Sequence, residues 1–502
     1  MTNRNRVHQN IVVAWCLIGW LSLPTLAWAS SDSPGDQASA VAPAGDALRE
    51  QLTRHLGRRR PDTPWQTEIT GRPLSVSGEL SLDLAHTAQP LPGGRNRQRD
   101  YLATWGLEVE GFYSLSDSVS LFAQWRLAND RQLHAPGLPQ RWKQHAERGE
   151  MWLHGRDIAG SGLDVQWGRI KFEEERRWWW DQELDALRLY HEGDEFGFSV
   201  AAAREQGRNR SDHRGIDAGQ KGVRRWLANA SWKWHPEQSV GIFVLRHDDR
   251  SVTEVVGQMV PVVAQDASDA RLTWIGASLR GEVDLRPAEA IAYWFDLARL
   301  SGREHALQYS ALAAPGPAQQ SVVTGLSTNQ LRGWAVDAGL RWQMPLPLRP
   351  RLSLAHATTF GGARGGAAGG FRQTGLQSNQ DDFGAEKEFA RYGAALAPEL
   401  SNLRITTIGI GLSMPQSSSL DLVYHRYRQV HAATELRGAR IDANLTGQQT
   451  GVGSALDLVA TFHPSQRMEV TATASTFRAG SAFGSLAGRR YHYAALAMRV
   501  SF

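Results

Sequence analysis

The stretch RWLANASWKW, residues 225–234, decides the fold of this chain. Apolar side chains occupy every second position and alternate with polar or charged ones. A period of two is that of a β-strand with one apolar face and one polar face. The apolar positions are Trp226, Ala228, Ala230, Trp232 and Trp234, and the polar positions include Arg225, Asn229, Ser231 and Lys233.

The same alternation recurs along most of the chain. It is clear in Leu80, Leu82 and Leu84, and again in the segments that begin at Trp105 and Val119. Marking every such segment predicts about eighteen strands. We expect them at 74–85, 102–114, 118–128, 147–155, 162–170, 185–192, 195–203, 222–234, 238–247, 270–281, 288–298, 332–343, 348–358, 404–413, 419–428, 452–462, 467–478 and 491–501.

The connections between these strands alternate between short and long. Residues 115–117 and 193–194 represent the short class, and residues 204–221 and 359–403 the long class. An even-stranded outer-membrane barrel requires this sorting, with tight periplasmic turns at one rim and long extracellular loops at the other. The sequence therefore predicts an all-β fold, a transmembrane antiparallel β-barrel in residues 74–502.

The first 29 residues have the features of a cleaved secretory signal peptide. A basic start precedes an apolar run from Ile11 to Leu26, and Ala27-Trp28-Ala29 fits a small-x-small cleavage site. A membrane anchor is the alternative, but the run is short for a spanning helix. The single cysteine, Cys16, lies in this segment, so the exported chain is expected to form neither disulfides nor cysteine metal sites.

The composition agrees with a barrel. The chain is 41% hydrophobic, has a mean hydropathy of -0.40 and contains 19 tryptophans. In a barrel only every second residue faces lipid, which keeps the average hydropathy low, and aromatic residues gather at both interfaces. Residues 30–73 do not alternate, and we expect an irregular periplasmic lead-in there. Its basic segment at 51–60 is either a contact for anionic lipid or polymer or a solvated run.

The predicted lumen carries charges of both signs. Only five of the 55 basic side chains are lysine, and arginine binds carboxylate through a planar fork. An arginine-lined path suits an anionic solute, although a GC-rich genome would enrich arginine as well. Strand parity turns inward the basic residues Arg126, Arg188, Arg225, Lys233, Arg341 and Arg499 and the acidic residues Glu79, Asp83, Glu108, Glu110, Asp337 and Asp457.

A second stretch, RRWWWDQELDALRL at 176–189, places three tryptophans beside several charges. Indole and guanidinium groups so close together are not all buried unless each finds a partner. We expect Trp178, Trp179 and Trp180 in the extracellular aromatic girdle or folded over the rim. The neighbouring carboxylates, such as Glu174, would pair with Arg176, Arg177 and arginines of the lumen.

Six segments, taken in order over roughly residues 100 to 502, resemble the alginate-export porin family of Gram-negative outer membranes. They are GLDVQWGRIKFEEERRWWWDQELDALRL at 162–189, FRQTGLQSN at 371–379, ARYG at 390–393, PELSNL at 398–403, SLDLVYHRYR at 419–428 and LDLV at 456–459. The resemblance implies a monomeric eighteen-stranded barrel with an electropositive, arginine-rich constriction that conducts a polyuronate outward.

The same resemblance implies a set of substrate-path residues. Matching motif to motif gives Arg169, Arg372, Arg391 and Arg478, with Lys171 as a neighbour, and these join the inward Arg126, Arg188, Arg341 and Arg499. Arg169 and Arg478 share parity with the outward Trp167 and Val470. They turn inward only if they lie past the lipid band or beyond a bulge.

We therefore expect an outer-membrane channel that conducts an anionic, alginate-like polysaccharide out of the periplasm. Loops 299–331 and 359–403 are the expected gates, and the second contains the glycine-rich run at 361–370. An anion-selective uptake porin for small acidic solutes is the alternative, because the residues do not specify a direction. An adhesin-like structural barrel would need no charged lumen.

An enzyme is a further alternative, since carboxylates lie near His191. The sequence contains no GxSxG or HExxH motif and no metal-spaced cluster, so no catalytic residue, cofactor or metal is expected. Expected partners are the anionic polysaccharide, outer-membrane lipid and lipopolysaccharide, a periplasmic polymer synthesis or export complex, and the assembly machinery that recognises a last strand ending at Phe502. Nucleic acid is not expected, because the net charge is only +4.

Overall fold

The computed structural model describes residues 49, 52, 64–90, 97–134, 142–251, 254–261, 265, 268–311, 320–361, 370–383, 386–441 and 445–502. The predicted signal peptide, residues 1–29, lies outside this part of the chain, and so does most of the predicted lead-in. Within the described ranges there is no helix long and apolar enough to cross a membrane.

Eighteen antiparallel strands form a closed barrel. Each strand pairs with its neighbour along the chain, and β2 pairs with β22 to close the wall. The strands are β2 (Arg72–Pro90), β3 (Arg97–Ser114), β4 (Val119–His134), β5 (Trp142–Gly155), β6 (Asp164–Glu173), β7 (Asp181–Glu192), β8 (Phe196–Ala203), β9 (Arg224–His235), β10 (Gln238–Asp248), β12 (Ser268–Arg286), β13 (Glu289–Ala311), β14 (Gln320–Gln343), β15 (Arg351–Phe360), β18 (Leu403–Met414), β19 (Ser418–Gln429), β20 (Gly451–Ser465), β21 (Met468–Ala479) and β22 (Arg490–Ser501).

The wall has the polarity of a membrane barrel. Outward side chains such as Ile242, Ile275 and Leu422 are exposed and apolar, whereas the inward Asp421 and Asp457 are fully buried. Apolar residues face outward because lipid, and not water, surrounds the wall. The alternation that predicted the strands thus separates a lipid face from a polar interior.

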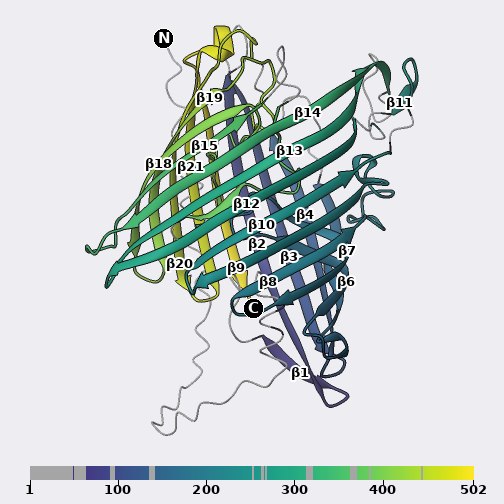
Figure 1. Ribbon diagram of the computed structural model, residues 1–502. Helices are drawn as coiled ribbons and strands as arrows, with labels where there is room; N and C mark the ends of the chain where they lie inside the picture. The colour runs from purple at the N-terminus through teal and green to yellow at the C-terminus, as the bar shows by residue number, and fades with distance from the viewer. Residues whose placement is uncertain are drawn as a thin grey trace. The chain divides into compact units, whose positions relative to one another are not determined.

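All eighteen predicted strands are present, and short and long connections sort to opposite rims as predicted. The turns from His235 to Gln238 and from Arg286 to Glu289 are tight, whereas the connection from β15 to β18 spans residues 361–402. Figure 1 shows the strands inclined across the wall, with β11 (Met259–Pro261) at the rim of long loops and the chain's C-terminal end toward the opposite rim.

Two strands are much longer than the alternation indicated. The segment 299–331 was expected to be a loop, but β13 and β14 stay paired as far as Ala311 and Ser321. Beyond the lipid band the outward face need not be apolar, and here it carries Arg303 and Arg332. The hydropathy pattern therefore ends before the backbone hydrogen bonds do, and the described residues of the expected gate continue the wall as paired strands.

A short strand also lies where the irregular lead-in was expected. β1 (Trp65–Ile69) pairs with the first residues of β2 in register from Trp65 and Val76 to Ile69 and Arg72. The two-residue turn has positive φ angles of 54° at Thr70 and 76° at Gly71. A turn with two positive φ angles matches the twist of paired strands, which explains the tight hairpin. In Figure 1 this hairpin lies at the rim of short turns.

Candidate functional site

Two segments of the chain occupy the lumen. One is residues 174–180, between β6 and β7, and the other is residues 370–402, between β15 and β18. They contact inward side chains on well-separated strands. The ring of Trp179 lies tilted against that of Phe243 of β10, with the centroids 3.8 Å apart, and the backbone N–H of Ala395 donates to the hydroxyl of Ser475 of β21 at 3.1 Å. We call the described residues of these two segments the lumen plug.

The first segment reaches the lumen because the end of the β6–β7 hairpin leaves the wall. β5 and β6 stay paired only between Gly155 and Met151, while β6 and β7 remain paired to their tips. Gly168 adopts a φ of 134° at the point of departure, and a Cβ there would lie 2.2 Å from the backbone oxygen of Met151. Residues beyond β8 take the vacated place, since the N–H of Arg148 donates to the oxygen of Asn209 at 2.9 Å.

This bend removes Arg169 from the lipid. Its Nε lies 3.3 Å from Glu183 and its Nη1 3.4 Å from Glu205, which belongs to the segment that replaces the hairpin in the wall. Arg148 pairs with Asp185 at 2.8 Å in the same cluster. Arg169 therefore does not face outward as Trp167, two residues earlier, does. It is part of a buried ion-pair cluster.

The three tryptophans are not in the aromatic girdle, and that prediction is wrong. Trp178, Trp179 and Trp180 are buried inside the barrel, at 1%, 4% and 5% exposure. Each finds a partner there: the indole N–H of Trp178 donates to the hydroxyl of Tyr392 at 2.7 Å, Trp179 packs against Phe243, and Trp180 forms a β-bridge with Leu376. The girdle prediction assumed that the strand continues straight past the membrane, whereas the hairpin turns inward at Gly168.

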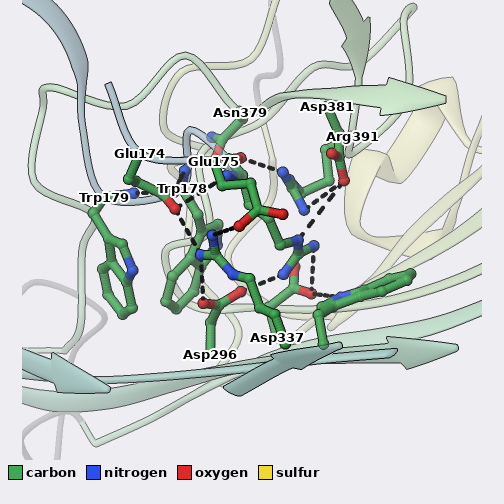
Figure 2. Close-up of polar contacts among 12 residues, drawn as sticks. Glu174, Glu175, Trp178, Trp179, Asp296, Asp337, Asn379, Asp381 and Arg391 are labelled. Carbon is green, nitrogen blue, oxygen red and sulfur yellow. Dashed lines mark hydrogen bonds and ion pairs between the residues drawn. The ribbon is translucent and has the colours of Figure 1, made fainter. Parts of the chain in front are cut away.

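Ion pairs join the lumen plug to the wall. Arg176 pairs with Asp296 of β13 and lies 3.1 Å from Asp337 of β14. Its guanidinium also lies over the ring of Trp294 at 4.6 Å. Arg391, from the second plug segment, pairs with Asp381 at 2.9 Å and donates to the backbone oxygen of Arg176. Figure 2 shows Asp337, Asp381 and Arg391 grouped around this centre.

Arg280 of β12 forms the second half of the network. It lies 2.6 Å from Glu174, 3.2 Å from Glu175 and 3.2 Å from Asp296. Glu174 also accepts hydrogen bonds from the backbone N–H groups of Arg176 and Trp178. Burial opposes ionisation of Glu174, but the pair with Arg280 and these hydrogen bonds hold its pKa below the ordinary value. Glu174 is thus a fixed anion that ties the plug to the wall.

Carboxylates outnumber guanidinium groups in this network. Arg176, Arg280 and Arg391 face Glu174, Glu175, Asp296, Asp337 and Asp381. An electropositive centre was expected from the family resemblance, but the arginines here are matched or exceeded by acids. The charges of this network are therefore compensated among the described residues of the lumen.

Most predicted path residues are engaged in the same way. Arg126 pairs with Glu108 and lies 2.8 Å from Glu183. The other pairs are Lys171 with Asp181 at 2.5 Å, Arg372 with Glu304 at 2.5 Å, and Arg499 with Glu388 of the plug at 3.3 Å and Glu79 at 3.8 Å. Arg341 lines a cavity of about 40 Å³ beside Arg176 and Arg391.

Arg188 differs from these residues. It lines a cavity of about 240 Å³ whose other walls include Lys171, Arg280, the rings of Phe172 and Trp179, and the carboxylates of residues 173–175. Its Nε donates to the hydroxyl of Ser199 at 3.1 Å, and its guanidinium lies over the ring of Tyr190 at 4.5 Å. Among the described residues, no carboxylate comes within ion-pair distance of Arg188. It is the predicted path arginine best placed to accept an external anion.

Arg478 lies outside the lumen, and its expected inward position is wrong. Its neighbours in sequence, Phe477 and Ala479, are buried on the inner face, and Arg478 is exposed on the outer face. No bulge reverses the alternation here, because β20 and β21 remain in register from the pair Phe462 and Val470 to the pair Gly453 and Ala479.

Sequence reasoning identified only part of this site. Strand alternation places Asp337 inward. Its partners Arg176 and Tyr392 come from loops, where no alternating pattern predicts the position of a side chain. Asp296 carried a usable signal, since it is a lone carboxylate in the apolar strand segment IAYWFDLA at 291–298. A buried charge of this kind requires a partner, which here is supplied by the plug.

Comparisons with known proteins agree with this architecture. A family model described as alginate export matches residues 93–497. The alginate production protein AlgE of Pseudomonas aeruginosa is 25% identical over 325 residues, which cover 64% of each chain. AlgE of Azotobacter vinelandii is 30% identical over 143 residues, covering 27% of this chain and 29% of the relative. The chain thus spans less than two thirds of the length of these relatives.

Solved structures with the same fold include two from Pseudomonas aeruginosa. OccD3 (OpdP) superposes with a TM-score of 0.50 at 11% identity, covering 88% of this chain and 95% of that chain. OccK7 (OpdD) gives 0.50 at 11% identity, covering 86% and 99%. At this identity the likeness concerns the fold alone. The closed wall, its lipid-facing outer surface and these neighbours define an outer-membrane porin-type barrel.

The match over residues 93–497 then specifies the group within that class. The chain belongs to the alginate export family of outer-membrane proteins.

Proposed function

We propose that this barrel conducts an anionic polysaccharide of the alginate type from the periplasm to the cell exterior. The family match over residues 93–497 and the relatives named for alginate production support the substrate class. The structural observation that carries the proposal is the way in which the lumen plug is held. Carboxylate–guanidinium pairs attach its segments to the wall.

Attachment of the lumen plug by carboxylate–guanidinium pairs suits a polyuronate, because the polymer offers a carboxylate on every sugar. Each uronate can replace one plug carboxylate on a guanidinium group, for example Glu174 on Arg280 or Glu388 on Arg499. The exchange substitutes one charge-assisted hydrogen bond for another, so it neither traps the polymer nor leaves a buried arginine unpaired. Shallow binding at many sites is what conduction requires.

The cavity beside Arg188 would offer the polymer a contact site. It already contains guanidinium groups together with the aromatic faces of Phe172 and Trp179. A guanidinium binds carboxylate, and an aromatic face packs against the C–H surface of a sugar ring. An uptake porin for small acidic solutes would use the same groups, but it would not need a plug as large as residues 370–402.

Planar-bilayer recording tests the proposal. We expect polymannuronate oligomers to block or modulate the current of the purified barrel, and Arg188→Gln to weaken that effect about tenfold through the loss of one charge-assisted contact. Arg299→Gln is the matched control, because Arg299 is exposed on the outer face over Trp334. Equal sensitivity of both variants, or a current indifferent to uronates, would contradict the proposed path.

The size of the conducted solute needs a second experiment. Proteoliposomes loaded with fluorescent oligouronates should release them through the barrel, and release should grow with chain length relative to a neutral dextran of the same size. Permeation limited to single acidic sugars would instead favour the uptake porin.

A further inference from the structure

Five exposed arginines lie on the outer surface of four strands near the rim of long loops. They alternate with buried inward neighbours such as Tyr427 and Phe477, so their side chains point away from the lumen. We call this set the outer arginine band, and it comprises Arg404 of β18, Arg426 and Arg428 of β19, Arg478 of β21 and Arg490 of β22.

The ladder register brings these arginines into direct opposition. Arg404 is paired with Arg428, and Arg478 is paired with Arg490. Ser454 of β20 faces Arg426 on one side and Arg478 on the other. Adjacent strands lie about 4.8 Å apart, so the guanidinium groups crowd along neighbouring rows. Like charges directly opposite each other destabilise a sheet.

The described residues do not neutralise this charge. Within the described part of the chain, no carboxylate lies within ion-pair distance of any of the five, and the outward positions of β18 to β22 carry no acidic residue. Arg428 donates from Nε to the hydroxyl of Thr450 at 3.0 Å. The remaining donors of the band face outward, where an external anion would relieve the repulsion.

The depth of the band in the membrane identifies that anion. Toward the rim of short turns, the same outward faces are apolar and exposed, as in Ile408, Leu422 and Leu456. The band therefore begins where the lipid-facing surface ends on the extracellular side. At this level the outer leaflet of a Gram-negative outer membrane presents the phosphorylated sugars of lipopolysaccharide.

We propose that the outer arginine band is a binding site for the phosphorylated diglucosamine headgroup of lipopolysaccharide. Paired arginines on adjacent strands can bind one phosphate through two guanidinium forks, which is the geometry that arginine favours for this anion. The exposed apolar rows beneath would contact the acyl chains of the same molecule. The basic surface continues across the pairing of β22 with β2 that closes the wall. There, Ala88 of β2 is in register with His492 of β22 on one side and with Arg99 of β3 on the other.

The test measures lipid binding by the purified, folded barrel. Native mass spectrometry with titrated bisphosphorylated lipid A should show retention by the unaltered protein and at least about a tenfold weaker retention by the Arg426→Gln, Arg478→Gln, Arg490→Gln triple variant. Lipid A stripped of both phosphates should bind equally weakly to both proteins.

The matched control removes the same charge from the opposite rim. The exposed residues of the short turns serve here, with the substitutions Arg286→Gln, Arg349→Gln and Arg467→Gln, and should leave binding of bisphosphorylated lipid A unchanged. Heat-modifiable gel mobility confirms that each variant has closed its barrel. Equal loss in both triple variants, indifference to the phosphates, or displacement of the lipid by oligouronates at these arginines would overturn the proposal.

Discussion

The indole N–H of Trp178 donates to the hydroxyl of Tyr392 at 2.7 Å, across 214 positions of sequence, and that hydroxyl donates to Asp337 of the wall at 2.7 Å. This relay joins both segments of the lumen plug to one strand. All three side chains are buried, so each hydrogen bond would leave an unsatisfied polar group if it were broken. At this point the plug is attached by hydrogen bonds between buried groups, and no water is at hand to take the place of a lost partner.

Tyr392→Phe should loosen the plug without removing its packing. The substitution takes away the hydroxyl and leaves the indole N–H of Trp178 without its acceptor, at a cost of about 1–3 kcal/mol. We expect a higher open probability in single-channel recordings and faster proteolysis of residues 370–402. Tyr293→Phe is the control, since its hydroxyl reaches Gln238 near the short-turn rim at 3.3 Å. An unchanged open probability in Tyr392→Phe would show that the relay does not hold the plug.

Arg176→Met should destabilise the closed barrel by about 3–5 kcal/mol, because Asp296 and Asp337 would lose a buried cation. Denaturant unfolding in detergent measures the loss. Arg72→Met provides the comparison, since Arg72 pairs with the exposed Asp117 at 3.1 Å and such surface pairs contribute less than about 1 kcal/mol. Similar losses in the two variants would mean that the wall carboxylates are reached by water or by another cation.

Conductance should depend on pH through Glu174. The pKa of this carboxyl is held below its ordinary value of about 4.3 in the closed state, so its contribution to closure is present above that pH. The contribution is lost as the pH falls through the lower, closed-state pKa. We expect conductance to rise on acidification below about pH 4. The Glu174→Gln variant should have at neutral pH the conductance that the unaltered protein has in acid. If the conductance of this variant still rose on acidification, the pH response would belong to another group.

Gly168→Ala should impair the inward bend of the β6–β7 hairpin. Gly168 has a φ of 134°, and the added Cβ would lie 2.2 Å from the oxygen of Met151. Backbone strain of this kind costs about 1–3 kcal/mol, and the clash adds to it. Gly488→Ala shares a positive φ of 80° but meets nothing within 4 Å. Thermal loss of gel-shift mobility should occur at a clearly lower temperature in Gly168→Ala than in Gly488→Ala.

The sequence is a good guide to the wall and a poor one to the lumen, for a physical reason. Lipid imposes a strict two-residue pattern on every spanning strand, and segments such as 225–234 express it fully. Outside the lipid this constraint ends, so the paired residues 299–311 of β13 were taken for a loop. The strand at Trp65–Ile69 was missed because both of its faces are largely exposed.

The candidate site was harder to predict, because contacts across the lumen leave no periodic trace. Parity placed Arg126, Arg188 and Arg499 correctly toward the interior, but it assumed a straight hairpin for Trp178 and its neighbours. A bend at one glycine moved these residues from the membrane interface to the centre of the barrel. The carboxylates that compensate the arginines come from strands and loops that are far apart in the sequence, and only the folded structure brings them together.

The pairing of β2 with β22 has a consequence for biogenesis. Ten residue pairs from Glu79 and Ser501 to Ala88 and His492 close the wall, and Gly78 and Phe502 exchange two backbone hydrogen bonds of 3.0 Å. Every other strand of the wall pairs with its neighbour along the chain, but this seam joins two strands that are far apart in sequence. Closure is therefore a late folding event with a long loop to close, and a molecule in which β22 has not yet paired with β2 has two open edges that quality-control proteases can recognise.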